Sequence, residues 1–332
     1  MPEQERDFVD AFAGQESSTG DGVTEAVHRR KRAHGYRHVA HLEAGRVGLI
    51  TTRENRGVSD PLEFDPALYR GTAGYYDRFR VPYPQLMLDE LLSLVQPSGN
   101  GRLLDLACGT GQITFAIAEQ FAEVWAVDQE RDMISAVREK ARVAGASHVR
   151  TAVSTAEALD APSAAFELVA IGNAFHRLRR DTVAAHAFRW LQPDRCIALL
   201  WGTGPWTGEA AWQRAMAGVL SSWRAKLGAE ARVPAGWDEA RRKRPDAAVL
   251  QAAGFDAVRS SRFPTAHDWT VDALIGFVYS TSFLPRDVVG DRAELLERDL
   301  RRELGGFETR NELHETIDFA YELARRPACR RD

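Results

Sequence analysis

The sequence contains little cysteine: only Cys108, Cys196 and Cys329 occur in 332 residues. Their wide separation does not match the short paired spacings of metal sites or the dense cysteines of small disulfide-bonded domains. We therefore expect free thiols, no bound metal, and a reducing compartment such as the cytoplasm.

The sequence also lacks an uninterrupted apolar run of the roughly 20 residues that a membrane helix needs. Its first five residues, MPEQE, are acidic, and no apolar segment typical of a signal peptide follows them. A strong charge imbalance is missing as well, because the formal net charge is −4 at pH 7. We therefore expect neither a membrane protein nor a nucleic-acid-binding protein.

From residue 65 onward, apolar strand-like and helical segments alternate. An amphipathic helix is predicted over 85–95, and strands are predicted at 102–107, 123–128, 148–153, 166–172 and 195–202. Helical patterns fill the gaps at 112–120, 132–144 and 181–190, and a further strand is predicted over 315–324. This alternation predicts an α/β fold with a doubly wound, mainly parallel sheet.

The first strand breaks into a glycine turn in the stretch LLDLACGTG. Gly109 and Gly111 follow the strand, where a ligand can approach a backbone without side chains. Asp105 precedes the turn, and Asp128 ends the second strand 23 positions later, near the offset at which an acid meets ribose hydroxyls. Thr114 stands where a dinucleotide fingerprint has its third glycine, and Asp105 would repel a pyrophosphate. An amino-acid nucleoside with an ammonium group is favoured over NAD.

Four successive stretches, LLDLACGTG, VWAVDQERDMI, STAEAL and FELVAIGNAFHRL, resemble in order and spacing the motifs of class I S-adenosylmethionine-dependent methyltransferases. The resemblance covers about residues 69–201 and implies a Rossmann-like sheet of seven strands. It departs from the usual motifs at Ala107, Thr155 and Asp194. It implies that the cofactor is bound by Asp105, Ala107, Gly109, Thr110, Gly111, Asp128, Gln129, Met133, Ala156, Glu157 and Asn173.

The sequence indicates the residues of the acceptor site less clearly than those of the cofactor site. The stretch YYDRFRVPYP resembles a segment that closes over the cofactor in small-molecule methyltransferases, and His176 is the candidate for a catalytic base or orienting group. We expect a small-molecule acceptor bound by Tyr76, Arg80, Tyr83, Trp206 and Tyr279. Its identity, the methylated atom and the oligomeric state stay open. The alternatives are a non-catalytic binding module, an NAD-dependent oxidoreductase, and a nucleic-acid methyltransferase anchored by the basic cluster 29–32.

The same reading divides the chain into four parts. Residues 1–65 are expected to be a largely disordered tail, because they are rich in Gly, Ser, Thr and charge without an apolar period. Residues 66–206 would form the cofactor-binding core with its cap helix, and 207–247 an inserted helical cap. Residues 248–327 would complete the core and supply acceptor-side elements.

Overall fold

The computed structural model describes residues 64–309 and 312–328. Nearly all of the predicted tail, with its basic cluster, and Cys329 lie outside these residues. In the described part, a seven-stranded sheet runs through the molecule in the order β3-β2-β1-β4-β5-β7-β6. The strands are β1 (Arg102–Leu106), β2 (Glu123–Asp128), β3 (Val149–Val153), β4 (Phe166–Gly172), β5 (Leu191–Gly202), β6 (Arg259–Trp269) and β7 (Leu313–Arg325).

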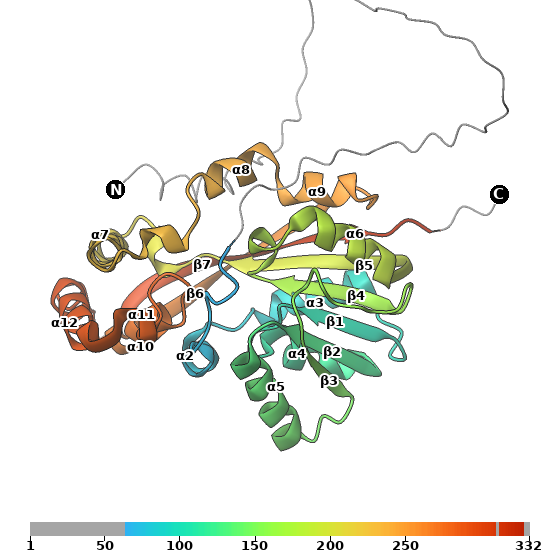
Figure 1. Ribbon diagram of the computed structural model, residues 1–332, viewed down its shortest axis with the longest axis horizontal. Coiled ribbons are helices and arrows are strands. Elements are labelled where there is room, and N and C mark those ends of the chain that lie inside the picture. The colour runs from blue at the N-terminus through green and yellow to red at the C-terminus, as the bar shows by residue number, and fades with distance from the viewer. Residues whose placement is uncertain (1–63, 310–311, 329–332) are drawn as a thin grey trace, which may run out of the picture.

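The first five strands are parallel, whereas β7 pairs antiparallel with both β5 and β6. The predicted α/β fold with a mainly parallel, seven-stranded sheet is therefore confirmed. Helices cover the sheet or extend beyond it, as Figure 1 shows. They are α2 (Ala73–Phe79), α3 (Gln85–Val95), α4 (Gln112–Ile117), α5 (Arg131–Ala144), α6 (Arg180–Trp190), α7 (Ala211–Leu227), α8 (Trp237–Lys243), α9 (Asp246–Ala252), α10 (Val271–Tyr279), α11 (Arg286–Val289) and α12 (Ala293–Leu304).

Both faces of the parallel sheet are buried, as alternation along β1 illustrates. Leu103 joins an apolar cluster with α3 and α4, whereas its neighbour Leu104 joins a second cluster with α6 and α9. Successive side chains point to opposite faces of a strand, so a nearly continuous apolar run is what a two-sided core requires. This rule explains why the parallel strands were readable from the sequence.

The long β6–β7 pair carries a second group of elements. One end of this pair projects beyond β1–β3, and Figure 1 shows α7, α10, α11 and α12 grouped around that end. Between β5 and β6 the chain forms α7, α8 and α9, in and just after the segment predicted as a helical insertion. The proposed domain boundaries themselves stay a prediction.

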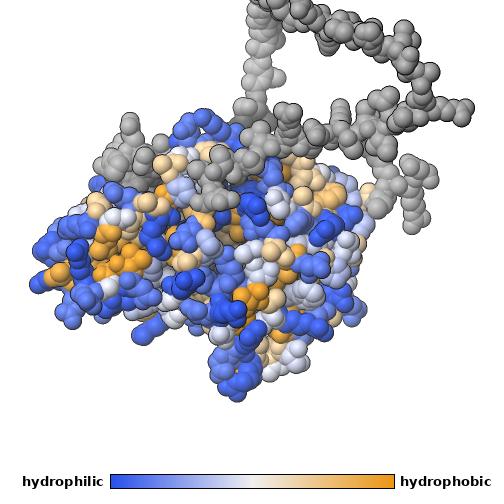
Figure 2. Space-filling model, in the orientation of Figure 1, coloured by the Kyte–Doolittle hydropathy of each residue, from blue (hydrophilic) through white to orange (hydrophobic). Residues whose placement is uncertain are grey.

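The surface of the described part is largely hydrophilic. In Figure 2 the hydrophobic residues form separate patches rather than one continuous face. Within residues 64–309 and 312–328, no helix combines the length and apolar character needed to span a bilayer.

Candidate functional site

A cavity of about 380 Å³ opens at the carboxyl ends of the parallel strands. In the strand order, β2 and β3 lie on one side of β1 and β4 and β5 on the other, so the direction of winding reverses between β1 and β4. Ligands of doubly wound sheets bind at this reversal. The cavity is lined by residues that follow four strands: Ala107 and Gly109 after β1, Asp128 to Glu130 at β2, Ser154 to Glu157 after β3, and Gly172 to Ala174 at β4.

The turn after β1 has an unusual backbone. Ala107, Gly109 and Gly111 have φ angles of 56°, 55° and 83°, a left-handed region that glycine enters without steric cost. Such dihedrals let the chain reverse sharply between β1 and α4. The turn thereby presents its backbone to the cavity at Gly109, where Tyr76 packs 3.4 Å from the position that a Cβ would occupy.

Asp128 connects this turn to the second strand. One carboxylate oxygen accepts a hydrogen bond from Gly109 N and the other from Glu130 N, each at 2.9 Å. The side chain is 8% exposed, and burial raises its pKa despite these bonds. Each carboxylate oxygen can accept two hydrogen bonds, so Asp128 retains accepting capacity at the cavity wall.

Asp105 lies behind the turn, not in the cavity lining. Its Oδ2 accepts hydrogen bonds from Thr114 N at 2.9 Å and Thr114 Oγ1 at 2.6 Å, which holds the first turn of α4 against β1. Its Oδ1 is buried without a hydrogen-bond partner among the described residues. Burial raises the pKa of Asp105 to about 7, against the opposing effect of Thr114. Asp105 thus does not line the cavity, and its contact with an ammonium group stays a prediction.

Residues 64–72, which we call the strap, cover the cavity together with Tyr76 of α2. Three hydrogen bonds tie the strap to the rest of the molecule. Gln129 Nε2 donates to Pro66 O at 2.9 Å, Gly71 N donates to Asp132 Oδ2 at 3.0 Å, and Arg232 Nη2 donates to Leu68 O at 3.1 Å. The strap closes the site with Phe64, Asp65, Pro66, Leu68 and Tyr69.

Asn173 forms the wall beyond β4, with a φ angle of 50°. Its side chain is held on both sides: Nδ2 donates to Tyr83 Oη and Oδ1 accepts from Gly202 N, both at 3.3 Å. Tyr83 in turn packs against Gly172, where an added Cβ would lie 2.7 Å from the tyrosine oxygen. Tyr83 therefore supports the cavity wall from behind and is not among the lining residues.

The loop after Asn173 brings Arg177 to the cavity, while His176 lies beside it and outside the lining. Arg177 Nε donates to His176 Nε2 at 3.0 Å, and Trp237 Nε1 donates to His176 O at 3.1 Å. An arginine N–H can only donate, so His176 Nε2 must be unprotonated. Burial, followed by the charges of Arg177 and nearby arginines, holds the pKa of His176 well below its usual value.

The other predicted acceptor residues belong mainly to the packed interior. Trp206 packs its ring against Phe277 and Phe283, with centroids 5.7 and 5.0 Å apart. Tyr279 is 2% exposed, and its hydroxyl lies 3.0 Å from Glu297 Oε1. Neither Tyr279 nor Trp206 is among the residues that line the cavity.

Arg80 is likewise engaged elsewhere. It donates to Ser280 Oγ and O at 2.9 and 3.0 Å, and its guanidinium lies between the rings of Tyr76 and Phe277. Of the five predicted acceptor residues, the cavity lining includes Tyr76 alone.

Most of the predicted cofactor residues line the cavity, whereas the residues of the strap that covers it were not predicted. Three of the predicted cofactor residues are absent from the lining: Asp105 lies in β1 behind the turn, and Thr110 and Gly111 lie in the turn itself. The lining residues that were not predicted include Tyr69, Glu130, Ser154 and Arg177. The sequence feature that could have indicated them is their position near a strand end or near the aromatic segment. The predicted residues in the lining are Ala107, Gly109, Asp128, Gln129, Met133, Ala156, Glu157 and Asn173.

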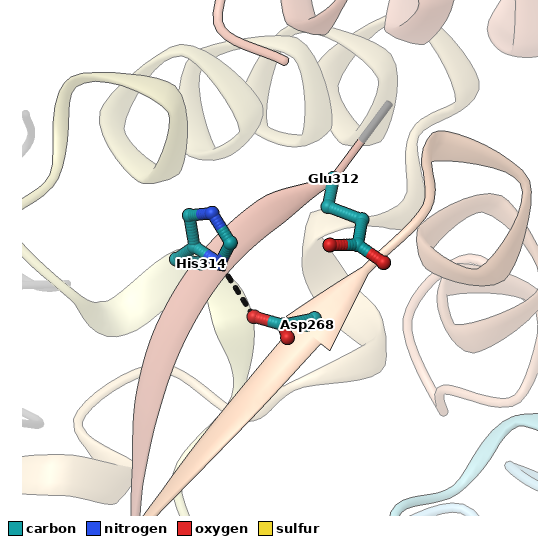
Figure 3. A group of neighbouring side chains, drawn as sticks. All are labelled: Asp268, Glu312 and His314. Carbon is teal, nitrogen blue, oxygen red and sulfur yellow. Dashed lines mark hydrogen bonds and ion pairs between the residues drawn. The ribbon is translucent and has the colours of Figure 1, made fainter. Parts of the chain in front are cut away.

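A group of possible metal ligands lies elsewhere, on the β6–β7 pair. Asp268 and His314 face each other across the two strands, with Glu312 beside them, as Figure 3 shows. His314 Nδ1 and Asp268 Oδ1 are 2.5 Å apart, and both side chains are more than half exposed. This geometry is that of an exposed cross-strand pair. The expected absence of a metal stays a prediction.

Comparison with known proteins finds a family match over the part of the chain that forms most of the cavity wall. Residues 103–194 match the family described as methyltransferase domain. This segment is a methyltransferase domain. It contains the glycine turn, Asp128 and the loop of Arg177, and therefore most of the cavity wall apart from the strap and Tyr76.

Individual relatives agree over the same region. An uncharacterized methyltransferase of Mycobacterium tuberculosis is 30% identical over 140 residues, which cover 42% of this chain and 54% of that protein. The putative methyltransferase YqeM of Bacillus subtilis is 36% identical over 73 residues, or 22% of this chain and 29% of YqeM. The chain thus matches about half the length, or less, of these relatives.

A solved structure supports the fold around the methyltransferase domain. A putative type II methyltransferase from Anaeromyxobacter dehalogenans superposes with a TM-score of 0.53 at 21% identity. The superposition covers 75% of this chain and 99% of the other. It therefore extends well beyond the family match.

Proposed function

We propose that the chain transfers the methyl group of S-adenosylmethionine to a small organic acceptor. The observation that carries this proposal is the joint placement of the Gly109 turn and Asp128 in the wall of one covered cavity, within a methyltransferase domain. A bare backbone turn beside a carboxylate with free accepting capacity fits a nucleoside with ribose hydroxyls.

The charge of the cavity fits this cofactor better than a dinucleotide. Burial raises the pKa of Glu130; the charge of Arg70 opposes this effect, whereas Asp132, Asp128 and Asp65 add to it, so several acids are gathered near Asp128. Such a wall attracts a sulfonium and an ammonium group, whereas it would repel a pyrophosphate. The lining holds four acids and two arginines, namely Asp65, Asp128, Glu130, Glu157, Arg177 and Arg179.

Bound S-adenosylmethionine would supply an electrophilic methyl group for in-line displacement. Asp128 would accept hydrogen bonds from the ribose, and Met133 would pack against the adenine. Tyr76 and Asn173 would fix the position of the acceptor, and the strap would exclude water from the reaction. Because His176 Nε2 is occupied by Arg177 and His176 lies outside the lining, we assign it a positioning role instead of base catalysis.

The strap also favours a small acceptor. A cavity covered by residues 64–72 and Tyr76 is enclosed enough to bind a small molecule, and a polymer would have to displace the hydrogen-bonded strap. We also propose that the acceptor is a secondary metabolite and that the protein acts in the cytoplasm.

Calorimetry with S-adenosylhomocysteine and NAD tests the cofactor assignment on the full chain. We expect saturable binding of S-adenosylhomocysteine and none of NAD; the reverse result would favour the oxidoreductase. Transfer of labelled methyl from S-adenosylmethionine to a panel of small acceptors then tests catalysis. Binding without any transfer across a broad panel would support the non-catalytic binding module.

A further inference from the structure

Arg177 is a cation in the cavity lining without an acidic partner. Its Nε donates to His176, and its Nη1 is buried without a hydrogen-bond acceptor in the described chain. The carbon of its guanidinium lies 5.0 Å from the ring centre of Tyr69 and 5.7 Å from that of Phe64, both in the strap. No ion pair joins Arg177 to a carboxylate within residues 64–309 and 312–328. The guanidinium thus has an N–H donor without an acceptor, on a residue that lines the cavity.

The neighbouring arginines show the contrast. Arg180 and Arg241 share the carboxylate of Asp246 at 2.8 and 2.7 Å, and Arg244 pairs with Asp181. Each of these cations is neutralised inside the fold, where a buried charge without a partner is costly. Arg177 has no such carboxylate partner in the described part of the chain, and it lines the cavity together with Arg179.

Arg177 is also held in position. The neutral His176 accepts from its Nε, and Trp237 holds His176 through its carbonyl and an edge-on ring contact at 5.1 Å. The two strap rings restrain the guanidinium from another side. A guanidinium whose orientation is fixed before binding loses little freedom when it meets a planar anion.

The cofactor does not provide that anion where Arg177 lies. If the proposed function holds, the only carboxylate of the cofactor belongs to its methionine part. The resemblance to class I methyltransferases implies that this part is held by Asp105, Ala107, Gly109 and Gly111. The Arg177 loop instead adjoins the end of the cavity after β3, since Arg179 N donates to Glu157 Oε1 at 2.8 Å. Asn173, which the proposed function places beside the acceptor, lies four positions before Arg177, and both residues line the cavity.

We propose that Arg177 binds an anionic group of the methyl acceptor, so that the substrate is a small organic acid or phosphate ester. This inference rests on the proposed function and narrows it. Carboxylate and phosphate share the paired acceptor oxygens that a guanidinium recognises through parallel N–H donors. His176 is then a positioning residue that acts through Arg177.

The test uses the full chain saturated with S-adenosylhomocysteine and three probes of similar shape: benzoate, phenyl phosphate and the neutral benzamide. Affinities are measured by saturation-transfer nuclear magnetic resonance and calorimetry. We expect at least one anion to bind roughly tenfold more tightly than benzamide. The affinities of benzoate and phenyl phosphate then show whether the site prefers a carboxylate or a phosphate.

Three variants separate anion binding from a structural role. Arg177→Gln should abolish the preference for the anion, while Arg177→Lys should retain part of it because the charge remains. Arg262→Gln, on an exposed arginine of β6, makes the same charge change outside the cavity and should leave the preference intact. In all three variants we expect the affinity for S-adenosylhomocysteine to stay within about threefold of the original.

Two results would overturn the inference while leaving the proposed function in place. One is equal binding of all three probes by the original protein. The other is a loss of more than roughly tenfold in S-adenosylhomocysteine affinity in Arg177→Gln, which would assign the guanidinium to the cofactor. Failure of the original protein to bind S-adenosylhomocysteine at all would instead remove the proposed function and this inference together.

Discussion

The carboxyl ends of β1–β4 and the far end of the β6–β7 pair use their side chains in opposite ways. At the first region, Asp128 and Arg177 keep hydrogen-bonding capacity beside a cavity. At the second, Trp206 packs against Phe277, Tyr279 packs against Tyr75, and the hydroxyl of Tyr279 has its partner inside the fold.

This difference teaches where to look for ligand binding. A polar group with unfilled capacity at a cavity wall is prepared for a ligand, whereas a buried aromatic side chain with complete contacts stabilises the fold. Substitutions in the first region should therefore change binding more than stability. Substitutions in the second should do the reverse.

Gly109→Val should have the largest effect on binding. Valine is strained at a φ of 55°, and its Cβ would lie 3.4 Å from Tyr76 while its branches fill the cavity wall. We expect affinity for S-adenosylhomocysteine to fall by more than about 100-fold in calorimetry, with helical circular dichroism preserved.

The matched control is Gly99→Val. Gly99 has a similar φ of 78°, but nothing lies within 4 Å of its added Cβ. It carries the same kind of backbone strain away from the cavity and should bind normally. Comparable loss in both variants would show that strain alone, and not approach of the ligand to the turn, explains the result.

Trp206→Ala tests the aromatic region, where we expect a substitution to lower stability more than binding. Removing this partly buried ring leaves Phe277 and Phe283 without their contact, which should lower the free energy of unfolding by about 2–4 kcal/mol. Urea unfolding measures this loss, and Trp206→Phe should recover part of it. Unchanged stability combined with lost acceptor turnover would return Trp206 to the acceptor site.

The same contrast between the two regions explains which site residues could be predicted from the sequence. Gly109, Asp128 and Met133 were found because each stands in or just after a short motif at a strand end, where local sequence determines position. Trp206 and Tyr279 were predicted to bind the acceptor but do not line this cavity, because their surroundings come from segments far apart in the chain. An aromatic residue bound to a ligand and one packed in a core have the same local sequence signal.

Arg177 illustrates a further limit. Its sequence neighbours His176 and Arg179 gave no sign of which arginine would lack an acid, because the partners of Arg180 lie more than 60 positions away. The strap was missed for a similar reason: nothing in its composition shows that it folds back over the sheet. The sheet itself was predictable because its strands repeat one local pattern.

Asp128→Ala should have an intermediate effect. The ribose hydroxyls would lose their acceptor, and Gly109 N and Glu130 N would lose theirs, which should weaken S-adenosylhomocysteine binding by about 1–3 kcal/mol. Asp105→Asn is the comparison, since asparagine can still accept from Thr114 behind the turn. We expect less than about a tenfold loss there. A larger loss in Asp105→Asn than in Asp128→Ala would place Asp105 in direct contact with the cofactor.

Glu322→Gln should have the smallest effect, and its sign depends on pH. Glu322 is a partly buried acid whose Oε2 is buried without a hydrogen-bond partner in the described chain, and it lies away from the cavity. Burial, with a contribution from Asp246, raises its pKa from 4.5 to about 7. Between these values the folded protein holds a proton that the unfolded chain has lost. Stability therefore falls as the pH rises toward 7, and the penalty is complete above it.

Glutamine removes that penalty, so Glu322→Gln should raise the melting temperature by about 2–4 °C at pH 8, corresponding to about 1 kcal/mol, and change it little at pH 4.5. Glu315 provides the matched acid, because its pKa is also raised to about 7 by burial but both oxygens accept hydrogen bonds, from Trp269 and Gln213. Glu315→Gln places an amide N–H against one of these donors and should destabilise at pH 8. If the two variants shifted the melting temperature in the same direction, unfilled capacity would not distinguish the sites, and the comparison between regions would lose its physical basis.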